Sequence, residues 1–239
     1  MEILNRTKKE EDRTLLDDLA QRELSRRKFL RFSGLAGASA LVVGSTSLTA
    51  CNKDDDGATD GVNLGSGDIG ILNYAYALEQ LEAAFYTQVI ASPYSGITAI
   101  ETSFLTDIRD HEIAHREFFK NALGGSAIRA LEVDFSSINF ASRDSVLGTA
   151  RAFEDLGVSA YDGAGYLLQD VNYLLLAGKI VSVEARHAAL IRELISPNTF
   201  LGDQVDPNSV NISRTPQEVL AIASTYIKSR IIANQLPTG

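Results

Sequence analysis

The sequence contains the pattern Glu-x-x-His twice, once ending at His115 and once ending at His187. Residues three apart lie on the same face of a helix, so in each pattern a carboxylate and an imidazole point the same way. Both groups bind metal ions. The chain has only three histidines, and two of them follow a glutamate (Glu112 and Glu184) by three residues, which chance rarely produces. The two patterns therefore predict a metal site.

Two further glutamates, Glu79 and Glu154, precede these patterns by 33 and 30 residues. A tyrosine follows each of them by seven residues, at Tyr86 and Tyr161. The nine residues ending at Tyr86 read LEQLEAAFY, and the nine ending at Tyr161 read FEDLGVSAY. The body of the chain is therefore predicted to consist of two related halves, each with a lone glutamate followed by Glu-x-x-His.

Long helices must position these residues, because apolar residues recur at helical spacing from Asp68 onward and few prolines interrupt them. Each helix has one of the four glutamates inside its apolar stripe, so four carboxylates and two imidazoles should point inward. A buried carboxylate without a partner costs several kcal/mol, roughly, and must meet a partner or a metal. We expect helices over residues 68–91, 98–123 and 142–169, then a fourth ending near Ile195.

The connections between these helices are predicted to be short, long and short, with residues 124–142 as the long one. Four helices joined in this way, with one long crossover, form the ferritin-like arrangement. A fifth helix is predicted from Thr215 to Asn234, because Thr215, Pro216 and Glu218 form a helix start with a capping box.

Residues 68–195 resemble the ferritin-like superfamily, on the two lone glutamates and the two Glu-x-x-His patterns. EARHAA, which begins at Glu184, and VSAY, which ends at Tyr161, are similar to the ferritin-like domain family that includes desiccation-related and stress-response proteins. The resemblance implies an all-α fold: a ferritin-like four-helix bundle with one long crossover and an extra C-terminal helix.

The resemblance also implies a dinuclear site for two iron or manganese ions. Glu79 and Glu154 would be terminal ligands, Glu112 and Glu184 would bridge the ions, and His115 and His187 would bind one ion each. Tyr86 and Tyr161 would lie near the ions and act in catalysis by donating an electron or a proton. The substrates implied are oxygen, peroxide or ferrous iron, in protection from oxidative or drying stress. A homo-oligomer is left open.

Some ferritin-like branches have an aspartate immediately before each bridging glutamate, where it orients a histidine. Here these two positions are His111 and Val183. Glu82 and Asp162 are expected to be solvated or to lie beside the ligands.

Two other functions remain open at this stage. The segment His111–His115 reads HEIAH, which matches the zinc metalloprotease motif in which both histidines bind zinc and Glu112 is the base. That interpretation leaves Glu79, Glu154 and His187 without a role. The other alternative is a non-catalytic envelope bundle that binds a metal or a partner. A metal-free bundle would have its glutamates and histidines satisfy one another.

The N-terminal region predicts export. Residues 25–31 read SRRKFLR, an uncharged stretch follows, and Leu48 to Cys51 resembles a lipobox. We expect a twin-arginine-type signal in residues 1–50, lipidation at Cys51 and a flexible acidic tether in residues 51–67. The protein would then be anchored to a membrane in the cell envelope, as a periplasmic or surface lipoprotein. One transmembrane helix in the uncharged stretch is the alternative.

After the signal and the tether, we expect two further regions: the four-helix bundle in residues 68–195 and a C-terminal extension with one helix in residues 196–239. The formal net charge is −9, and the acidic excess lies after residue 50. Nucleic acid is excluded as a partner because its binding needs a basic surface. A single cysteine excludes a disulfide framework within the chain.

Overall fold

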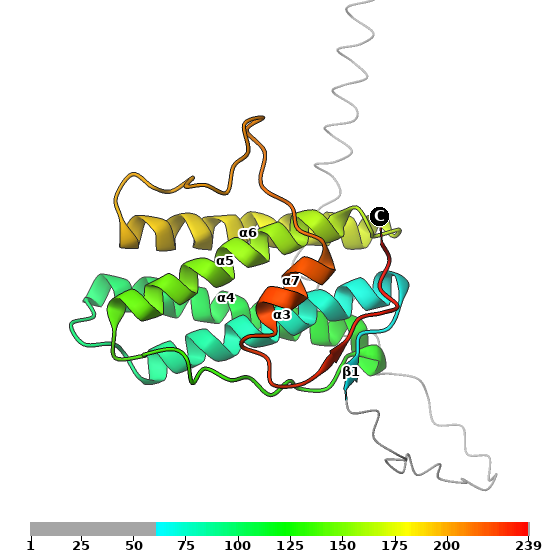
Figure 1. Ribbon diagram of the computed structural model, residues 1–239, viewed down its shortest axis with the longest axis horizontal. Coiled ribbons are helices and arrows are strands. Elements are labelled where there is room, and N and C mark those ends of the chain that lie inside the picture. The colour runs from blue at the N-terminus through cyan, green and yellow to red at the C-terminus, as the bar shows by residue number, and fades with distance from the viewer. Residues whose placement is uncertain (1–60, 239) are drawn as a thin grey trace, which may run out of the picture. The chain divides into compact units, whose positions relative to one another are not determined.

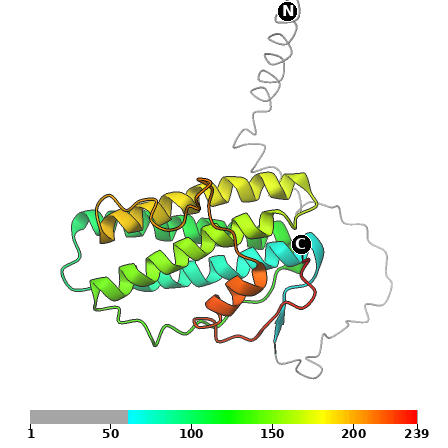
Figure 2. The ribbon, with the colours of Figure 1, turned by 45° about the horizontal axis from the view of Figure 1, so that its top comes forward.

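The computed structural model describes residues 61–238. The predicted signal and Cys51 lie outside the described residues. Four long helices run side by side and form the body of the fold (Figures 1 and 2). They are α3 (Gly67–Ala91), α4 (Ala99–Leu123), α5 (Arg143–Gly165) and α6 (Val171–Ile195).

Side-chain caps set where these helices begin. The side chain of Thr98 accepts a hydrogen bond from the Glu101 amide, and the Glu101 carboxylate accepts one from the Thr98 amide, which makes a capping box for α4. Ser142 and Asp170 cap α5 and α6 in a simpler way, each by accepting from an amide in the first turn. The predicted helix starts are therefore confirmed to within one or two residues.

The end of α5 differs from the prediction. The helix stops at Gly165 instead of Gln169. The amides of Gln169 and Asp170 donate to the carboxylate of Asp68, which lies at the start of α3, so the chain turns here instead of adding another helical turn. A side chain far away in the sequence thus fixes this boundary.

The helices pack as two pairs, α3 with α4 and α5 with α6. The crossover between the pairs begins with a short 3-10 helix, η1 (Gly124–Ser126), and continues to Ser142. Buried polar side chains of α3 hold it: Asn73 donates to the Ser126 carbonyl and accepts from the Ile128 amide, and Gln80 accepts from the Leu131 amide. The all-α four-helix bundle with one long crossover is confirmed.

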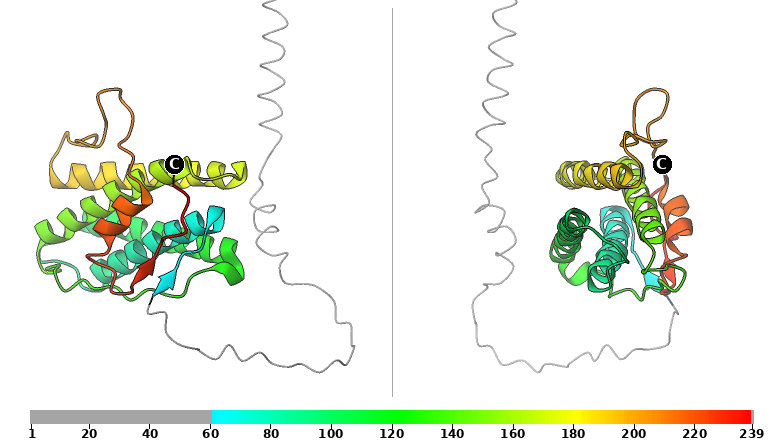
Figure 3. Two further views of the ribbon diagram at one scale, coloured as in Figure 1. Left: turned by 45° about the vertical axis from the view of Figure 1, so that its right-hand side comes forward. Right: turned by 90° about the vertical axis from the view of Figure 1, so that its left-hand side faces the viewer.

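The C-terminal helix is present but much shorter than predicted. Helix α7 (Pro216–Ala223) packs on α5, and the chain then leaves the helical path (Figure 3). Ile227 bridges to Val133 in the crossover, and strand β2 (Ile231–Ile232) pairs in parallel with strand β1 (Val62–Asn63). The expected end at Asn234 is wrong because these β-branched residues find extended partners elsewhere in the chain.

The predicted flexible tether, residues 51–67, is also too long at its C-terminal side. Val62 and Leu64 are buried, and their amides donate to the carbonyls of Arg230 and Ile232. Residues 61–67 therefore belong to the folded body, because the C-terminal segment supplies them with a strand partner. Among the described residues, no helix combines the length and the apolar character needed to span a membrane.

Candidate metal centre

The structure gathers the six predicted ligand residues at one level of the bundle, one glutamate coming from each long helix. They form two groups that share two members, and within each group the candidate ligand atoms lie within 4.8 Å of one another. The first group is Glu79, Glu112, His115 and Glu184, and the second is Glu112, Glu154, Glu184 and His187.

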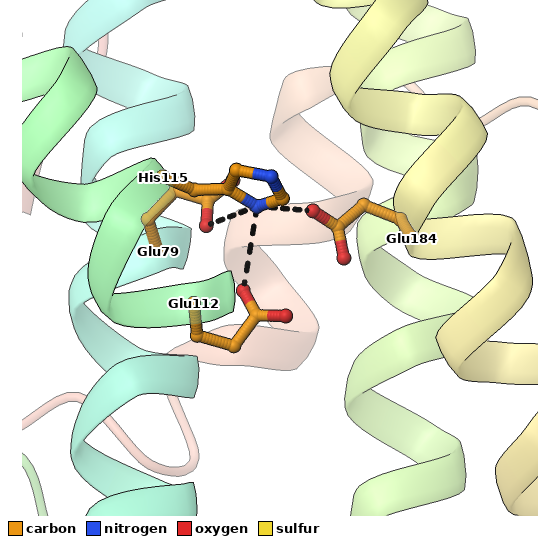
Figure 4. Close-up of side chains that lie close together, drawn as sticks. All are labelled: Glu79, Glu112, His115 and Glu184. Carbon is orange, nitrogen blue, oxygen red and sulfur yellow. Dashed lines mark ion pairs between the residues drawn. The ribbon is translucent and has the colours of Figure 1, made fainter. Parts of the chain in front are cut away.

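In the first group, Nδ1 of His115 faces three carboxylates at once (Figure 4). It lies 2.8 Å from Oε1 of Glu184, 3.6 Å from Oε2 of Glu79 and 3.9 Å from Oε2 of Glu112. These side chains come from α3, α4 and α6, so three helices supply the donors of one group.

The second group repeats this arrangement with α5 in place of α3. Nδ1 of His187 lies 2.9 Å from Oε1 of Glu112, 3.2 Å from Oε2 of Glu184 and 3.5 Å from Oε2 of Glu154. The two halves of the sequence therefore give two equivalent sets of donors.

Glu112 and Glu184 connect the two groups. Each turns one carboxylate oxygen toward His115 and the other toward His187. Both side chains are at most 1% exposed. This is the arrangement that two carboxylates need in order to bridge a pair of cations.

Tyr86 and Tyr161 form hydrogen bonds with the two remaining glutamates. Each tyrosine contacts the glutamate of the other half of the chain. The hydroxyl of Tyr86 on α3 donates to Oε1 of Glu154 on α5, and the hydroxyl of Tyr161 on α5 donates to Oε1 of Glu79 on α3. Each hydrogen bond occupies one carboxylate oxygen and leaves Oε2 facing a histidine.

The unpartnered atoms test whether the group of residues fits a metal. Oxygens of all four glutamates, and Nδ1 of His115, are buried without a hydrogen bond. They lie near one another, but their directions do not suit hydrogen bonds. A buried polar atom without a partner costs about 1–3 kcal/mol, and a cation in each group would supply partners for these atoms. Oxygen-rich donors with two imidazoles suit iron or manganese. The residues therefore fit metal ions.

When no metal is bound, the two histidine rings are charged and form ion pairs with these carboxylates. Burial alone would lower the pKa of His115 and of His187, but the facing carboxylates raise both pKa values to about 12. Burial would raise the pKa of Glu112, but the two histidines lower it to about 2. The metal-free group thus holds imidazolium rings against a bridging carboxylate.

The pKa values of the two other glutamates, Glu79 and Glu154, are raised, in contrast to that of Glu112. Burial, the largest cause, raises the pKa of Glu154 to about 8, although His187 works against it. Burial, with the charges of Glu184 and Glu112, raises the pKa of Glu79 well above its ordinary value. With a pKa of about 8, Glu154 retains at neutral pH a proton that a cation would displace.

Glu82 lies beside the ligands, the second of the two places expected for it. It is 5% exposed, and burial together with the charges of Glu112 and Glu154 raises its pKa well above the ordinary value. Its Oε1 lies 3.2 Å from where a Cβ on Gly157 would be, and Gly157 follows Glu154 by the same three residues as Glu82 follows Glu79. Asp162 is half-buried and belongs to neither group.

His111 is not a member of either group. Its Nδ1 lies 2.9 Å from Nε2 of His187, and the two ring planes are 14° apart with their centroids 5.1 Å apart, so the ring nitrogens meet edge to edge. The two histidines of HEIAH thus contact different partners, and the zinc-protease pair is not assembled. The contact between His111 and His187 was not predicted from the sequence. Its only signal was the position of His111 immediately before a bridging glutamate.

No curated protein sequence matches this chain. The model of the ferritin-like domain family matches residues 67–197, more than half of the 239 residues and the whole of the four-helix bundle. With the fold and the buried carboxylate and histidine groups, this match shows that the chain belongs to the ferritin-like domain family.

Proposed function

We propose that this protein is an exported, lipid-anchored ferritin-like protein with a carboxylate-bridged dinuclear iron or manganese site. The single observation that carries the proposal is the orientation of Glu112 and Glu184. Each directs one oxygen to each histidine, so the two groups share both bridging residues. Export and the anchor rest on the N-terminal pattern, from the twin arginine to Cys51.

Two such ions, when bound, supply redox chemistry: oxidation of ferrous iron, or reduction or dismutation of peroxide. The chain supplies the surroundings. Glu79 and Glu154 are the proposed terminal ligands, and both are buried to 1% exposure or less, which keeps bulk water away. The proposed biological role, protection from oxidative or drying stress, rests on likeness to the family.

Tyr86 and Tyr161 are the proposed catalytic side chains. Each hydroxyl keeps its proton, because burial first and then the nearby carboxylate charges raise the pKa of both phenols well above the ordinary value. Each therefore holds a proton and an oxidisable ring one hydrogen bond away from a terminal ligand. This placement suits proton or electron donation toward a substrate.

A small apolar cavity reaches one of the two proposed catalytic side chains, Tyr161. It has a volume of about 30 Å³ and is lined by apolar side chains, among them Leu78, Phe119 and Ala160, and by Tyr161. A space of this size holds a molecule no larger than about one or two waters. Oxygen fits this lining better than a charged substrate does.

Metal analysis of the purified full chain tests the proposal. After supply of iron, manganese and zinc, we expect two iron or manganese ions per chain, lost in Glu112→Ala and kept in Glu117→Ala. Glu117 is a matched control, since it lies on the same helix and its exposed carboxylate pairs with Arg116. Consumption of oxygen or peroxide by the loaded chain would support the redox function. Ions without turnover would point to a non-catalytic metal-binding bundle, and no bound ion would refute the proposal.

A further inference from the structure

The two histidines of the site have different neighbours on their outer side. Nε2 of His187 lies 2.9 Å from Nδ1 of His111. His111 immediately precedes Glu112, and the equivalent position in the other half, immediately before Glu184, is Val183. Valine has no polar side-chain atom, so His115 gains no such partner from that position.

The chemistry of the ring fixes what this contact does. Nδ1 of His187 faces the three carboxylates, so it is the atom that a cation in the second group would take. The neutral ring then has its proton on Nε2, and that N–H donates to Nδ1 of His111. An acceptor on the far nitrogen fixes the orientation of a metal-binding imidazole and makes it a stronger ligand.

Burial adds to the difference. The side chain of His187 is 5% exposed and that of His115 is 14% exposed. Water therefore competes more for the ring of His115, and a hydrogen bond from its outer nitrogen to water holds the ring less firmly than a fixed side chain does.

We propose that His111 is a positioning residue that makes the two ion positions unequal. The position formed with Glu154 and His187 binds its ion more tightly and fills first, and the position formed with Glu79 and His115 fills second. This inference rests on the proposed dinuclear site, and it adds an order of filling that the equal donor sets do not give.

The test is an equilibrium titration of the metal-free full chain with Mn²⁺. The native chain should bind in two separate steps. His111→Ala should weaken the tighter step by about 10–100-fold and leave the weaker step unchanged. His111→Asn, which keeps an acceptor near the place of Nδ1, should restore most of the affinity. Val183→Ala is the matched control at the equivalent position and should change neither step.

A second readout identifies the histidine concerned. The chain has only three histidines, so side-chain nitrogen NMR of the chain loaded with Zn²⁺, a diamagnetic stand-in, gives a simple spectrum. In the native chain, Nε2–H of His187 should exchange slowly with water, and in His111→Ala it should exchange fast. His111 is exposed, so this variant should fold, and its helical content can be checked by circular dichroism.

The outcomes are distinct. Two steps of equal affinity in the native chain, or a change of both steps or of neither in His111→Ala, would overturn the inference and leave the dinuclear site standing. A native chain that binds no ion would overturn the proposed function and this inference with it.

Discussion

Helix α3 buries seventeen of its 25 residues, whereas α6, which has the same length, buries six. The crossover, α4 and α5 pack against α3, while α6 packs mainly on α5 and keeps an open face. Both helices nevertheless bury their glutamate to the same 1% exposure, Glu79 on α3 and Glu184 on α6. The burial of these glutamates therefore depends on their position along the helix and not on how much of the whole helix is buried.

Among the positions at which the halves differ, two place a polar side chain of one half beside the donors of the other. The first half has Glu82 where the second has Gly157, and the first has His111 where the second has Val183. Each difference puts a polar side chain from the first half next to the second half. The halves are therefore equivalent in their donor residues and different in the residues around the donors.

The largest effect is expected for the residues that both halves share. Glu184→Ala removes an oxygen from each group, so binding of both ions should be lost. Glu79→Ala removes a donor from the first group alone, so one ion should remain. Ions per chain, measured by elemental analysis, distinguish these results. Loss of both ions in both variants would show that the groups do not fill independently.

Stability of the metal-free chain should fall as the pH rises. The folded pKa of each histidine, about 12, lies above its ordinary value of 6.5, so its contribution is full below pH 6.5 and is lost toward pH 12. The pKa of Glu154, raised from 4.5 to about 8, gives a further loss over that interval. Denaturant unfolding should therefore give a lower midpoint at pH 9 than at pH 6.

The same measurement has an internal check. Glu154→Gln removes one titrating group, so the decrease between pH 5 and pH 8 should become smaller. In the opposite direction, the lowered pKa of Glu112 makes its contribution present above pH 4.5 and lost as the pH falls toward 2. A midpoint that rises from pH 6 to pH 9 would contradict these pKa directions.

Tyr86→Phe and Tyr161→Phe should destabilise the metal-free chain by similar amounts, about 1–3 kcal/mol each, because each leaves a buried carboxyl oxygen without its donor. Denaturant unfolding measures both. Tyr166→Phe is the control, since Tyr166 is 85% exposed. Clearly unequal costs would mean that the two cross-half hydrogen bonds are not equivalent.

The smallest effect concerns two glycines of α5. Gly148 has open space where a Cβ would stand, so Gly148→Ala should stabilise the chain by about 0.5–1 kcal/mol. In Gly157→Ala the new Cβ would lie 3.2 Å from Oε1 of Glu82, and this tight contact should cancel the gain. Thermal unfolding of both variants resolves the difference, and an equal gain in both would show that Glu82 moves freely.

The sequence predicted the four long helices and the gathering of the six side chains at one place, because both depend on local spacing. A glutamate inside an apolar stripe must point inward, and Glu-x-x-His puts two donors on one helix face. The shared groups followed from having this pattern in both halves. The partners of Tyr86 and Tyr161 did not follow, because a seven-residue spacing does not say which half each hydroxyl reaches.

Contacts between distant segments were the other part that spacing could not predict. The end of α5 is fixed by Asp68, and the end of α7 by strand partners at Val62 and Val133. The contact of His111 with His187 joins residues 76 positions apart. Such pairings depend on how whole helices and segments pack together, and no periodic pattern in the sequence indicates them.

The pairing of β1 with β2 has a mechanical consequence. A pulling force on the residues before Val62 enters the fold at Val62 and Leu64, whose amides donate to the carbonyls of Arg230 and Ile232 across a parallel pair of strands. In this geometry the bonds are loaded together, in shear. The C-terminal segment therefore bears part of the force before it reaches α3. A pull from the N-terminal side then leaves the four glutamates in place for as long as these hydrogen bonds hold.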